Sequence, residues 1–296
     1  MKSGKTPPQT TSMTAFARHE AAVPWGALTW ELRSVNHRYL DIALRLPEEL
    51  RSLEPRGREM INTRLSRGKV DGTLRFQPNE AVAGAIEMSA EQVQRLLTAS
   101  DHLRSLAPDV APLRAVDILR WPGVIKAPPL DVESLGAAAL EALSTTLTEL
   151  VATRNREGAR LQEFMLARLQ SMEEMAEKAK TLSPEAARLF RERLEARLKE
   201  LKQQLDPMRL EQEIVLFAQK ADVTEEIDRL TAHFAEIRRV FTQPGPVGRR
   251  LDFLMQELNR EANTLSSKST DTRLTNIAVE LKVLIEQMRE QVQNIE

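Results

Sequence analysis

The sequence predicts an α+β fold, in which an N-terminal lobe of mixed sheet and helices precedes a long-helix, coiled-coil-like bundle and a C-terminal helical region. Apolar residues alternate with a period of two before about residue 80 and recur with a helical period from residue 89 onward. The chain has 296 residues, 42% hydrophobic and 29% charged, as is typical of a globular protein with a sizeable core. We expect a disordered tail over residues 1–11, an α+β domain over 12–130, a long helical bundle over 131–208 and a C-terminal helical domain over 209–296.

The N-terminal lobe contains the strand patterns. Alternation predicts strands near residues 13–18, 28–34 and 39–46, the last stopped by Pro47, and a fourth strand over 70–76. Between the third and fourth strands, apolar residues from Leu50 to Leu65 recur at helical spacing, and Gly68 ends this helix. The lobe is therefore expected to be a sheet with helices packed against it.

The remainder of the chain has a helical pattern. Ser89 begins a predicted helix, five prolines between residues 108 and 129 divide the next region, and long helices follow Asp131. We expect interruptions near Pro184, near Pro207 and at the Pro-Gly-Pro link over 244–246. Leucines with coiled-coil-like spacing occur at 194, 198, 201 and 205, and a similar series comprises Leu274, Ile277, Leu281, Leu284 and Met288. Such series indicate either self-assembly or the packing of helices within one chain.

Composition and charge exclude several classes of protein. The chain contains no cysteine, which rules out disulfides, thiolate metal sites and cysteine nucleophiles. No apolar run approaches the roughly 20 residues that span a bilayer, and residues 1–12 do not resemble a signal peptide, so a cytoplasmic protein is expected. The net charge is −1, but residues 1–79 carry thirteen Lys and Arg against eight Asp and Glu. A basic lobe joined to an acidic one would suit a phosphate-rich substrate, and ordinary solvated charge is the alternative.

The candidate chemistry lies in two predicted helices in the last third of the chain. In the first, Thr224 is a good N-cap, and Glu225 and Glu226 in the first turn are favoured by the helix dipole. Glu226 and His233 are seven residues apart and project from the same side of this helix. A carboxylate and an imidazole on one face can bind a divalent ion or act as acid and base, whereas most lone helical histidines do neither.

The second helix, from Gly248 to Lys268, mixes acids with amides. One face carries Asp252, Gln256, Asn259 and Asn263, and another carries Glu257, Glu261, Thr264 and Lys268. Hard oxygen ligands of this kind suit Mg²⁺ or Mn²⁺. Asp252 lies about 140° around the helix from Glu257, so the two can ligate one ion only if the helix breaks or a second chain contributes.

Two further groups of residues could contact a polyanion. Arg249, Arg250 and Arg260 of the second helix carry guanidinium groups, which bind phosphates well. The segment Asn36-His37-Arg38-Tyr39 enters the third predicted strand, where it is either a turn that caps the strand or a surface that faces a polyanion. The sequence has no Gly-rich phosphate loop, no Gly-x-Ser-x-Gly, no His-Glu-x-x-His and no zinc-finger spacing. A P-loop nucleotide hydrolase is therefore not expected.

At these residues the chain resembles the YicC family of bacterial endoribonucleases. The resemblance is carried by residues 12–18, 30–41, 46–50, 53–55, 66–70, 220–230, 233, 248–253, 256–264 and 267–269, and it extends over residues 12–296. These long ungapped strings are highly specific. The chain departs from the family at Ala15, where Gly is frequent, and at Leu265, where Ile is frequent. Neither change affects the residues expected to carry the chemistry.

The resemblance implies a divalent-metal-dependent endoribonuclease, a hydrolase that cuts phosphodiester bonds in structured RNA, assembled as a homohexamer around a channel. The implied catalytic residues are Glu226, His233, Glu257 and Glu261, and the implied ligands of Mg²⁺ or Mn²⁺ are Glu257, Glu261, Asp252 and His233. Given an RNA substrate, the residues predicted to bind it are Arg33, Asn36, His37, Arg38, Arg249, Arg260 and Lys268. The division between ligands and proton-transfer groups stays open. A non-catalytic RNA-binding oligomeric adaptor and a coiled-coil scaffold without RNA are the alternatives.

Overall fold

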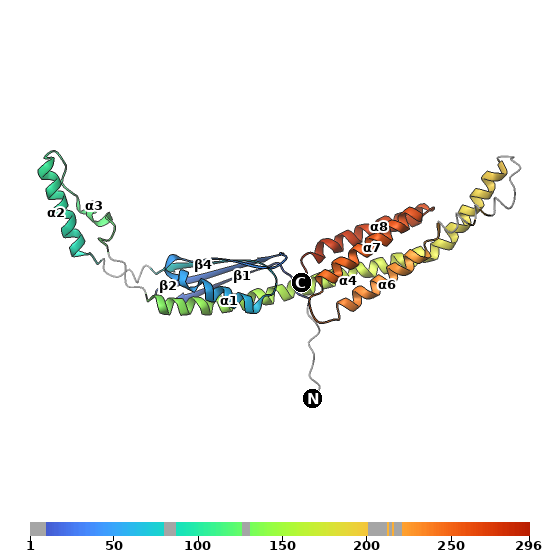
Figure 1. Ribbon diagram of the computed structural model, residues 1–296, viewed down its shortest axis with the longest axis horizontal. Coiled ribbons are helices and arrows are strands. Elements are labelled where there is room, and N and C mark those ends of the chain that lie inside the picture. Colours follow the sequence, from blue (N-terminus) through green and yellow to red (C-terminus); the bar gives the residue numbers. More distant parts are fainter. Residues whose placement is uncertain (1–9, 80–86, 126–130, 201–211, 213–214, 216–220) are drawn as a thin grey trace, which may run out of the picture.

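The computed structural model describes residues 10–79, 87–125, 131–200, 212, 215 and 221–296. The molecule is elongated, and one helix, α4 (Val132–Glu200), runs along most of its length (Figure 1). An N-terminal sheet packs against the first half of α4, and three C-terminal helices pack against its second half. The predicted α+β fold class, with a sheet-and-helix lobe followed by long helices, is confirmed.

The N-terminal sheet has four strands in the order β1-β2-β4-β3. The strands are β1 (Ala15–Val23), β2 (Gly26–Val35), β3 (Leu40–Arg45) and β4 (Gly68–Pro78). β2 pairs antiparallel with both β1 and β4, while β3 pairs parallel with β4. The parallel pairing requires a crossover, which is made by the 3-10 helix η1 (Glu48–Leu53) and helix α1 (Glu54–Arg64). All four predicted strands and the helix between the last two are present.

The N-terminal core lies between one face of this sheet and α4. Leu28, Trp30 and Leu32 alternate along β2 and form one buried cluster with Leu143 and Leu147 of α4. Trp30 donates a hydrogen bond from its indole Nε1 to the carbonyl of Ala139, at 2.8 Å. This bond satisfies the single polar atom of a fully buried side chain, which fixes the sheet on the helix.

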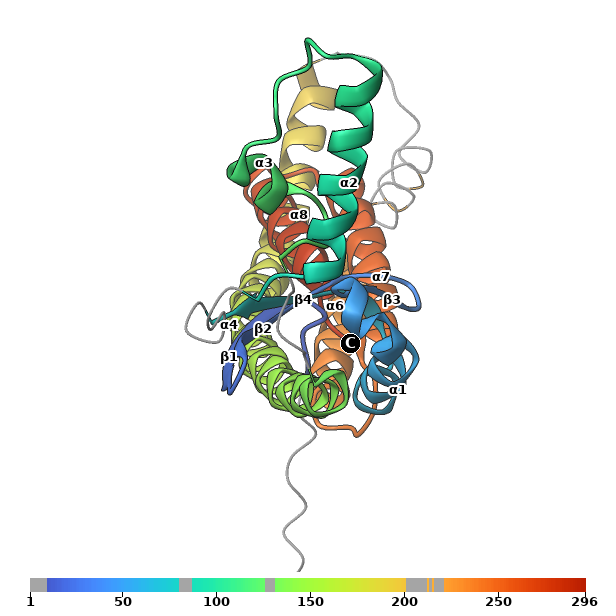
Figure 2. The same cartoon turned by 90° about the vertical axis from the view of Figure 1, so that its left-hand side faces the viewer.

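Helices α2 (Ala90–Leu106) and α3 (Ala115–Arg120) stand apart from the sheet (Figures 1 and 2). Ser89 caps α2 by accepting a hydrogen bond from the backbone N–H of Gln92, as its sequence predicts. Neither helix buries a residue, although both are fully described. Their apolar side chains, Leu103 and Leu106 among them, are exposed in this single chain, as is Trp121 directly after α3.

The C-terminal core is a bundle of α4 with α6 (Thr224–Val240), α7 (Gly248–Lys268) and α8 (Thr272–Val292). In Figure 1 these three helices run beside the second half of α4. Leu274, Leu281 and Met288 of α8 are buried in this core, and Ile277 and Leu284 pack against it. The apolar residues of the α8 series therefore pack against other helices of the same chain.

Two local predictions are wrong. Pro184 was expected to interrupt the long helix, but α4 continues through it. An internal proline costs about 3 kcal/mol, and buried residues on both sides of it, Ala179 and Ala186, hold the helix together. Thr224 was expected to be the N-cap of α6, but Val223 occupies that position, and Asp222 Oδ1 accepts a hydrogen bond from the Thr224 N–H at 2.9 Å.

Several sequence expectations fall outside the described residues. Residues 1–9 of the predicted tail, Pro207, and the side chains of the leucines at 194, 198, 201 and 205 are among them. The proposed domain limits stay predictions. The expectation that no apolar run is long enough to span a bilayer is wrong by length and composition, because a stretch within residues 132–193 of α4 meets both conditions. Of that window, 44% is buried inside the protein.

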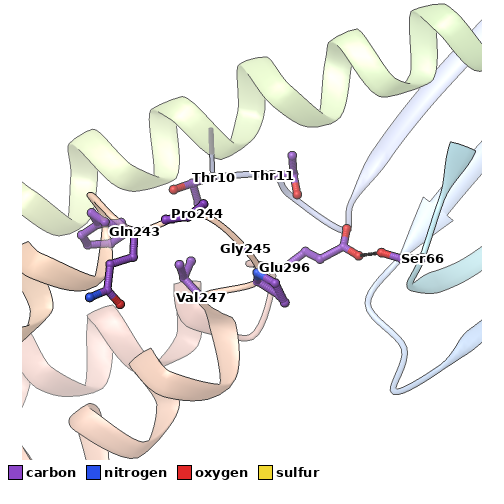
Figure 3. Close-up of a pocket in the computed structure, with 10 residues that line it drawn as sticks. Thr10, Thr11, Ser66, Gln243, Pro244, Gly245, Val247 and Glu296 are labelled. Carbon is purple, nitrogen blue, oxygen red and sulfur yellow. Dashed lines mark hydrogen bonds between the residues drawn. The ribbon is translucent and has the colours of Figure 1, made fainter. Parts of the chain in front are cut away.

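A joint connects the two cores where residues near 12 and 296 meet beside Arg154. The Arg154 side chain is 2% exposed and donates from Nε to the carbonyl of Ser12 at 2.7 Å, and from both terminal nitrogens to the carbonyl of Arg67 at 3.3 and 3.4 Å. It also forms an ion pair with Glu296 Oε2 at 2.6 Å. Burial lowers the pKa of Arg154, and the charge of Glu296 opposes that shift. Figure 3 shows the Glu296 carboxylate accepting a hydrogen bond from Ser66, at the edge of a pocket of about 330 Å³.

Gly248 provides a test of how closely α7 approaches this joint. A Cβ at Gly248 would lie 2.2 Å from the carbonyl oxygen of Ile295, a backbone atom that cannot rotate away. We expect Gly248→Ala to lower the free energy of unfolding by about 1–3 kcal/mol, measured by urea denaturation. Gly136→Ala is the matched control, because Gly136 lies inside α4 and its Cβ would make only an ordinary 3.4 Å contact with the Leu53 side chain. This substitution should stabilise the protein by roughly 0.5–1 kcal/mol. Equal effects of the two substitutions would contradict the close approach.

Candidate functional site

The candidate site is built on the antiparallel pair α6 and α7. Three ion pairs cross the pair: Glu226–Lys268 at 2.8 Å, Arg229–Glu261 at 3.4 Å, and Glu236–Arg250. The apolar stripes of both helices, from Ile227 and Leu251 onward, face the core and leave the polar residues along their shared edge. We call Glu226, Arg229, Glu261 and Lys268 the α6–α7 ion cluster.

Glu226 is the most constrained carboxylate of the cluster. It is 5% exposed, and its Oε1 pairs with Lys268, whose Nζ also donates to the carbonyl of Asp222 at 3.2 Å. Its Oε2 is buried without a hydrogen-bond partner among the described residues. A buried carboxylate oxygen left without a donor is costly, so this atom points to a missing cation or donor. Hydrogen bonds from Thr224 lower the pKa of the neighbouring Asp222, and the charge of Lys268 adds to that shift.

Glu261 is the second buried carboxylate. It is 4% exposed, and its Oε1 accepts a hydrogen bond from Arg229. Arg229 also pairs with Glu225 at 2.5 Å, so that one guanidinium bridges an acid of each helix. The hydrogen bond to Glu261 is the largest cause of the raised pKa of Arg229, and the charges of both acids add to it. Two carboxylates that are nearly fully buried, each with one cation, are an unusual arrangement for a helix pair.

His233 and Glu257 lie along the same edge between α6 and α7, one helical turn beyond the Arg229–Glu261 pair. His233 follows Arg229 by four residues, and Glu257 precedes Glu261 by four, so the antiparallel register brings the two side chains to the same height. Both are partly exposed. Neither side chain has a hydrogen-bond or ion-pair partner within the described part of the chain. Four of the predicted site residues, Glu226, His233, Glu257 and Glu261, therefore share one edge.

Asp252 is not brought to that edge. Its Oδ2 accepts a hydrogen bond from Gln256 Nε2 at 3.0 Å, and Asn259 and Asn263 follow along the same exposed side of α7. Over the described residues, no group of three or more His, Asp and Glu side chains comes close enough to hold a metal ion. One chain thus provides two buried carboxylates and not a complete set of ligands.

A divalent ion fits the chemistry of the ion cluster. The unpartnered Oε2 of Glu226 and the oxygens of Glu261 are hard donors of the kind that Mg²⁺ and Mn²⁺ prefer. Magnesium usually keeps several waters and takes only one or two carboxylates from the protein. The pair of buried acids is therefore compatible with a divalent ion, with His233 and Glu257 at the next level of the edge.

The predicted RNA-binding residues lie in four places. Arg33 is exposed on the open face of the sheet, Arg260 is exposed on α7, and Lys268 belongs to the ion cluster. Asn36, His37 and Arg38 are exposed in the loop between β2 and β3, and the fold brings this loop beside Arg249 at the start of α7. Sequence reasoning missed two residues, Arg229 as a partner of Glu261 and Arg67 as a neighbour of Arg38 and Arg249. The basic string over residues 66–69 was the available signal for Arg67.

Fold and site together define a class: an α+β protein whose helical C-terminal region holds two buried acids paired with cations. The family model for the N-terminal region of YicC-like endoribonucleases matches residues 10–163, and the model for the C-terminal part of endoribonuclease YicC-like proteins matches residues 179–296. The chain belongs to the YicC-like endoribonuclease family.

Two relatives are similar over nearly their whole length. A protein of Haemophilus influenzae named probable endoribonuclease YicC is 42% identical over 285 residues, which cover 96% of this chain and 99% of the relative. A protein of Clostridioides difficile with the same name is 31% identical over 293 residues, which again cover 96% and 99%. The resemblance seen in the sequence is thereby confirmed.

Proposed function

We propose that this protein is a divalent-metal-dependent endoribonuclease that cleaves phosphodiester bonds in structured RNA. The family supports the RNA-cleaving activity, since both relatives are named probable endoribonucleases. The single observation that carries the metal dependence is the buried, unpartnered Oε2 of Glu226 on the same helix edge as the buried Glu261. Each acid already has one cationic partner, but the buried Oε2 of Glu226 still lacks a donor or cation, which a divalent ion would supply.

In this proposal each residue of the edge has a role. Glu226 and Glu261 hold the divalent ion, which would act as a Lewis acid and lower the pKa of bound water. Lys268 and Arg229 keep the two carboxylates in position through their ion pairs and offset negative charge near the scissile phosphate. His233 and Glu257, which are partly exposed and have no side-chain partner among the described residues, accept and return the proton.

The proposal extends to assembly and location. One chain contributes two buried acids, and within its described residues no third ligand joins them. Neighbouring chains in a homohexamer around a channel would supply the remaining ligands, with Asp252 as a candidate on the exposed side of α7. A cytoplasmic location is part of the same proposal.

Cleavage of a labelled stem-loop RNA tests this function. We expect the purified protein to cut the RNA in Mn²⁺ or Mg²⁺ and to lose activity by at least about 100-fold in EDTA, with recovery when metal is added back. Denaturing gels resolve internal cuts from trimming at the ends. Tight RNA binding without cutting in any metal would contradict the enzyme and leave an RNA-binding adaptor. Cutting that persists in EDTA would contradict only the metal dependence.

A further inference from the structure

A cleft of about 390 Å³ lies where three segments distant in sequence meet. The loop before β3 contributes Arg38 and Tyr39, the turn before β4 contributes Ser66 and Arg67, and the start of α7 contributes Arg249. Three guanidinium groups therefore line one cleft, although the residues that carry them are up to 211 positions apart. Local sequence patterns do not predict this convergence.

The positive charge of the cleft is not neutralised. None of Arg38, Arg67 and Arg249 forms an ion pair with an acid among the described residues. Glu296 also lines the cleft, but its carboxylate is already bound by Arg154 and Ser66. Three cations line this concave site against one carboxylate that Arg154 already binds, so the cleft favours an anionic ligand, and the planar guanidinium group matches phosphate geometry.

The position of Arg249 adds a second, independent argument. It lies in the first turn of α7, a turn with no acidic residue and no side-chain cap. The N-terminus of a helix carries partial positive charge, so a cation there is unfavourable for the isolated protein. An anion bound between Arg249 and its neighbours would relieve this repulsion.

The other two arginines are held by local contacts. Arg67 donates from Nε to the carbonyl of His37 at 3.0 Å, which leaves its terminal nitrogens available. The guanidinium of Arg38 lies over the ring of Tyr39, with 5.2 Å between its central carbon and the ring centroid. Tyr39 is nonetheless 62% exposed, so part of its ring is open to a flat partner. An exposed aromatic ring beside a phosphate-binding group suits unpaired nucleotides, whose bases can stack on it.

We propose that this cleft binds the phosphodiester backbone of an unpaired RNA segment, with Tyr39 stacking on an adjacent base. The proposal rests on the proposed function only in taking RNA as the ligand. The cleft is separate from the ion cluster, because Arg249 and Glu261 are twelve residues apart on α7, or about 18 Å along the helix at 1.5 Å per residue. The cleft anchors the single-stranded flank of a structured RNA at a distance from the α6–α7 ion cluster.

Fluorescence anisotropy in EDTA tests the cleft in the full chain, because RNA is then bound without metal-dependent cutting. The probes are a labelled stem-loop with an unpaired flank, a single-stranded oligoribonucleotide and a blunt RNA duplex. We expect Arg249→Ala and Arg38→Ala each to weaken binding of the first two probes several-fold, and each to reduce the slope of log affinity against log salt by about 0.7. Tyr39→Leu should weaken binding by about fivefold or more, with a smaller change in the salt slope. The matched control is Arg104→Ala, an exposed arginine of α2 without an ion pair.

The outcomes separate this inference from the proposed function. Wild-type affinity and salt slope in the Arg38 and Arg249 variants would contradict RNA binding by the cleft, even if the protein cleaves RNA. Weakened binding in these variants would support RNA binding by the cleft, even if no cleavage is found. Equal loss with the blunt duplex, together with unchanged binding by Tyr39→Leu, would overturn the assignment to unpaired RNA. Circular dichroism confirms that each variant is folded.

Discussion

An isosteric Glu261→Gln substitution is expected to lower the rate of metal-dependent RNA cleavage by at least about 100-fold while leaving RNA affinity nearly unchanged. Glutamine keeps an oxygen that can accept the hydrogen bond from Arg229, so the helix pair should stay intact. It removes the negative charge that would hold a divalent ion. Glu226→Gln is expected to act in the same way, because it neutralises the carboxylate whose Oε2 has no partner among the described residues.

Single-turnover cleavage of a labelled stem-loop at saturating protein measures the effect on the chemical step. Glu290→Gln is the matched control, since this glutamate is exposed on α8 and has no side-chain partner in the described part of the chain. Thermal unfolding of each variant shows whether a loss of cleavage results from the removed charge or from unfolding of the protein. Wild-type cleavage by both Glu226→Gln and Glu261→Gln would exclude the ion cluster as the active site. A parallel Glu257→Gln variant then shows whether the neighbouring pair, His233 and Glu257, carries the chemistry.

Arg154→Ala is expected to have the largest effect on stability, a loss of about 3–5 kcal/mol. The substitution leaves the Glu296 carboxylate without its cation, and it removes the donors to the carbonyls of Ser12 and Arg67. At roughly 2–4 °C per kcal/mol, the melting temperature should fall by about 10 °C, which differential scanning calorimetry measures. Arg160→Ala, a change at a 78% exposed arginine six residues further along α4, should cost less than about 0.5 kcal/mol.

A double variant identifies the cause of this loss. Arg154→Met with Glu296→Gln removes both charges, so no unpaired buried ion remains. We expect it to be less destabilised than the sum of its two single variants, because the unpaired charge is the main cost. Strict additivity would contradict the ion pair as the source of the stability.

Much of the fold was predictable because it depends on local patterns. The strand alternation and the leucine series of α8 each followed from how one face must be buried, and both are present. Pro184 was misread because packing around Ala179 and Ala186 outweighs a local penalty. Local rules capture a residue's preference but not the tertiary contacts that override it.

The candidate site was predictable only in part. The spacing of Glu226 and His233 identified one edge of α6, but the pairing of Glu226 with Lys268 depends on how two helices dock. The same limit applies to Arg67, which joins Arg38 and Arg249 only after the sheet and α7 are brought together. Nothing in the local sequence distinguished Arg154, which falls among ordinary charged residues of a helix, from its exposed neighbours.

The joint beside Arg154 also bears on the order in which the protein is made and folds. Its partners are far apart in sequence, and the hydrogen bond between Thr14 and Asn294 alone joins residues 280 positions apart, at 3.3 Å. Closing a loop of that length costs about 5 kcal/mol of chain entropy. During synthesis the sheet and the first half of α4 can form their core while the rest of the chain is still emerging from the ribosome. The residues near 296 then close the joint, so the contacts that connect the two cores form after the N-terminal core.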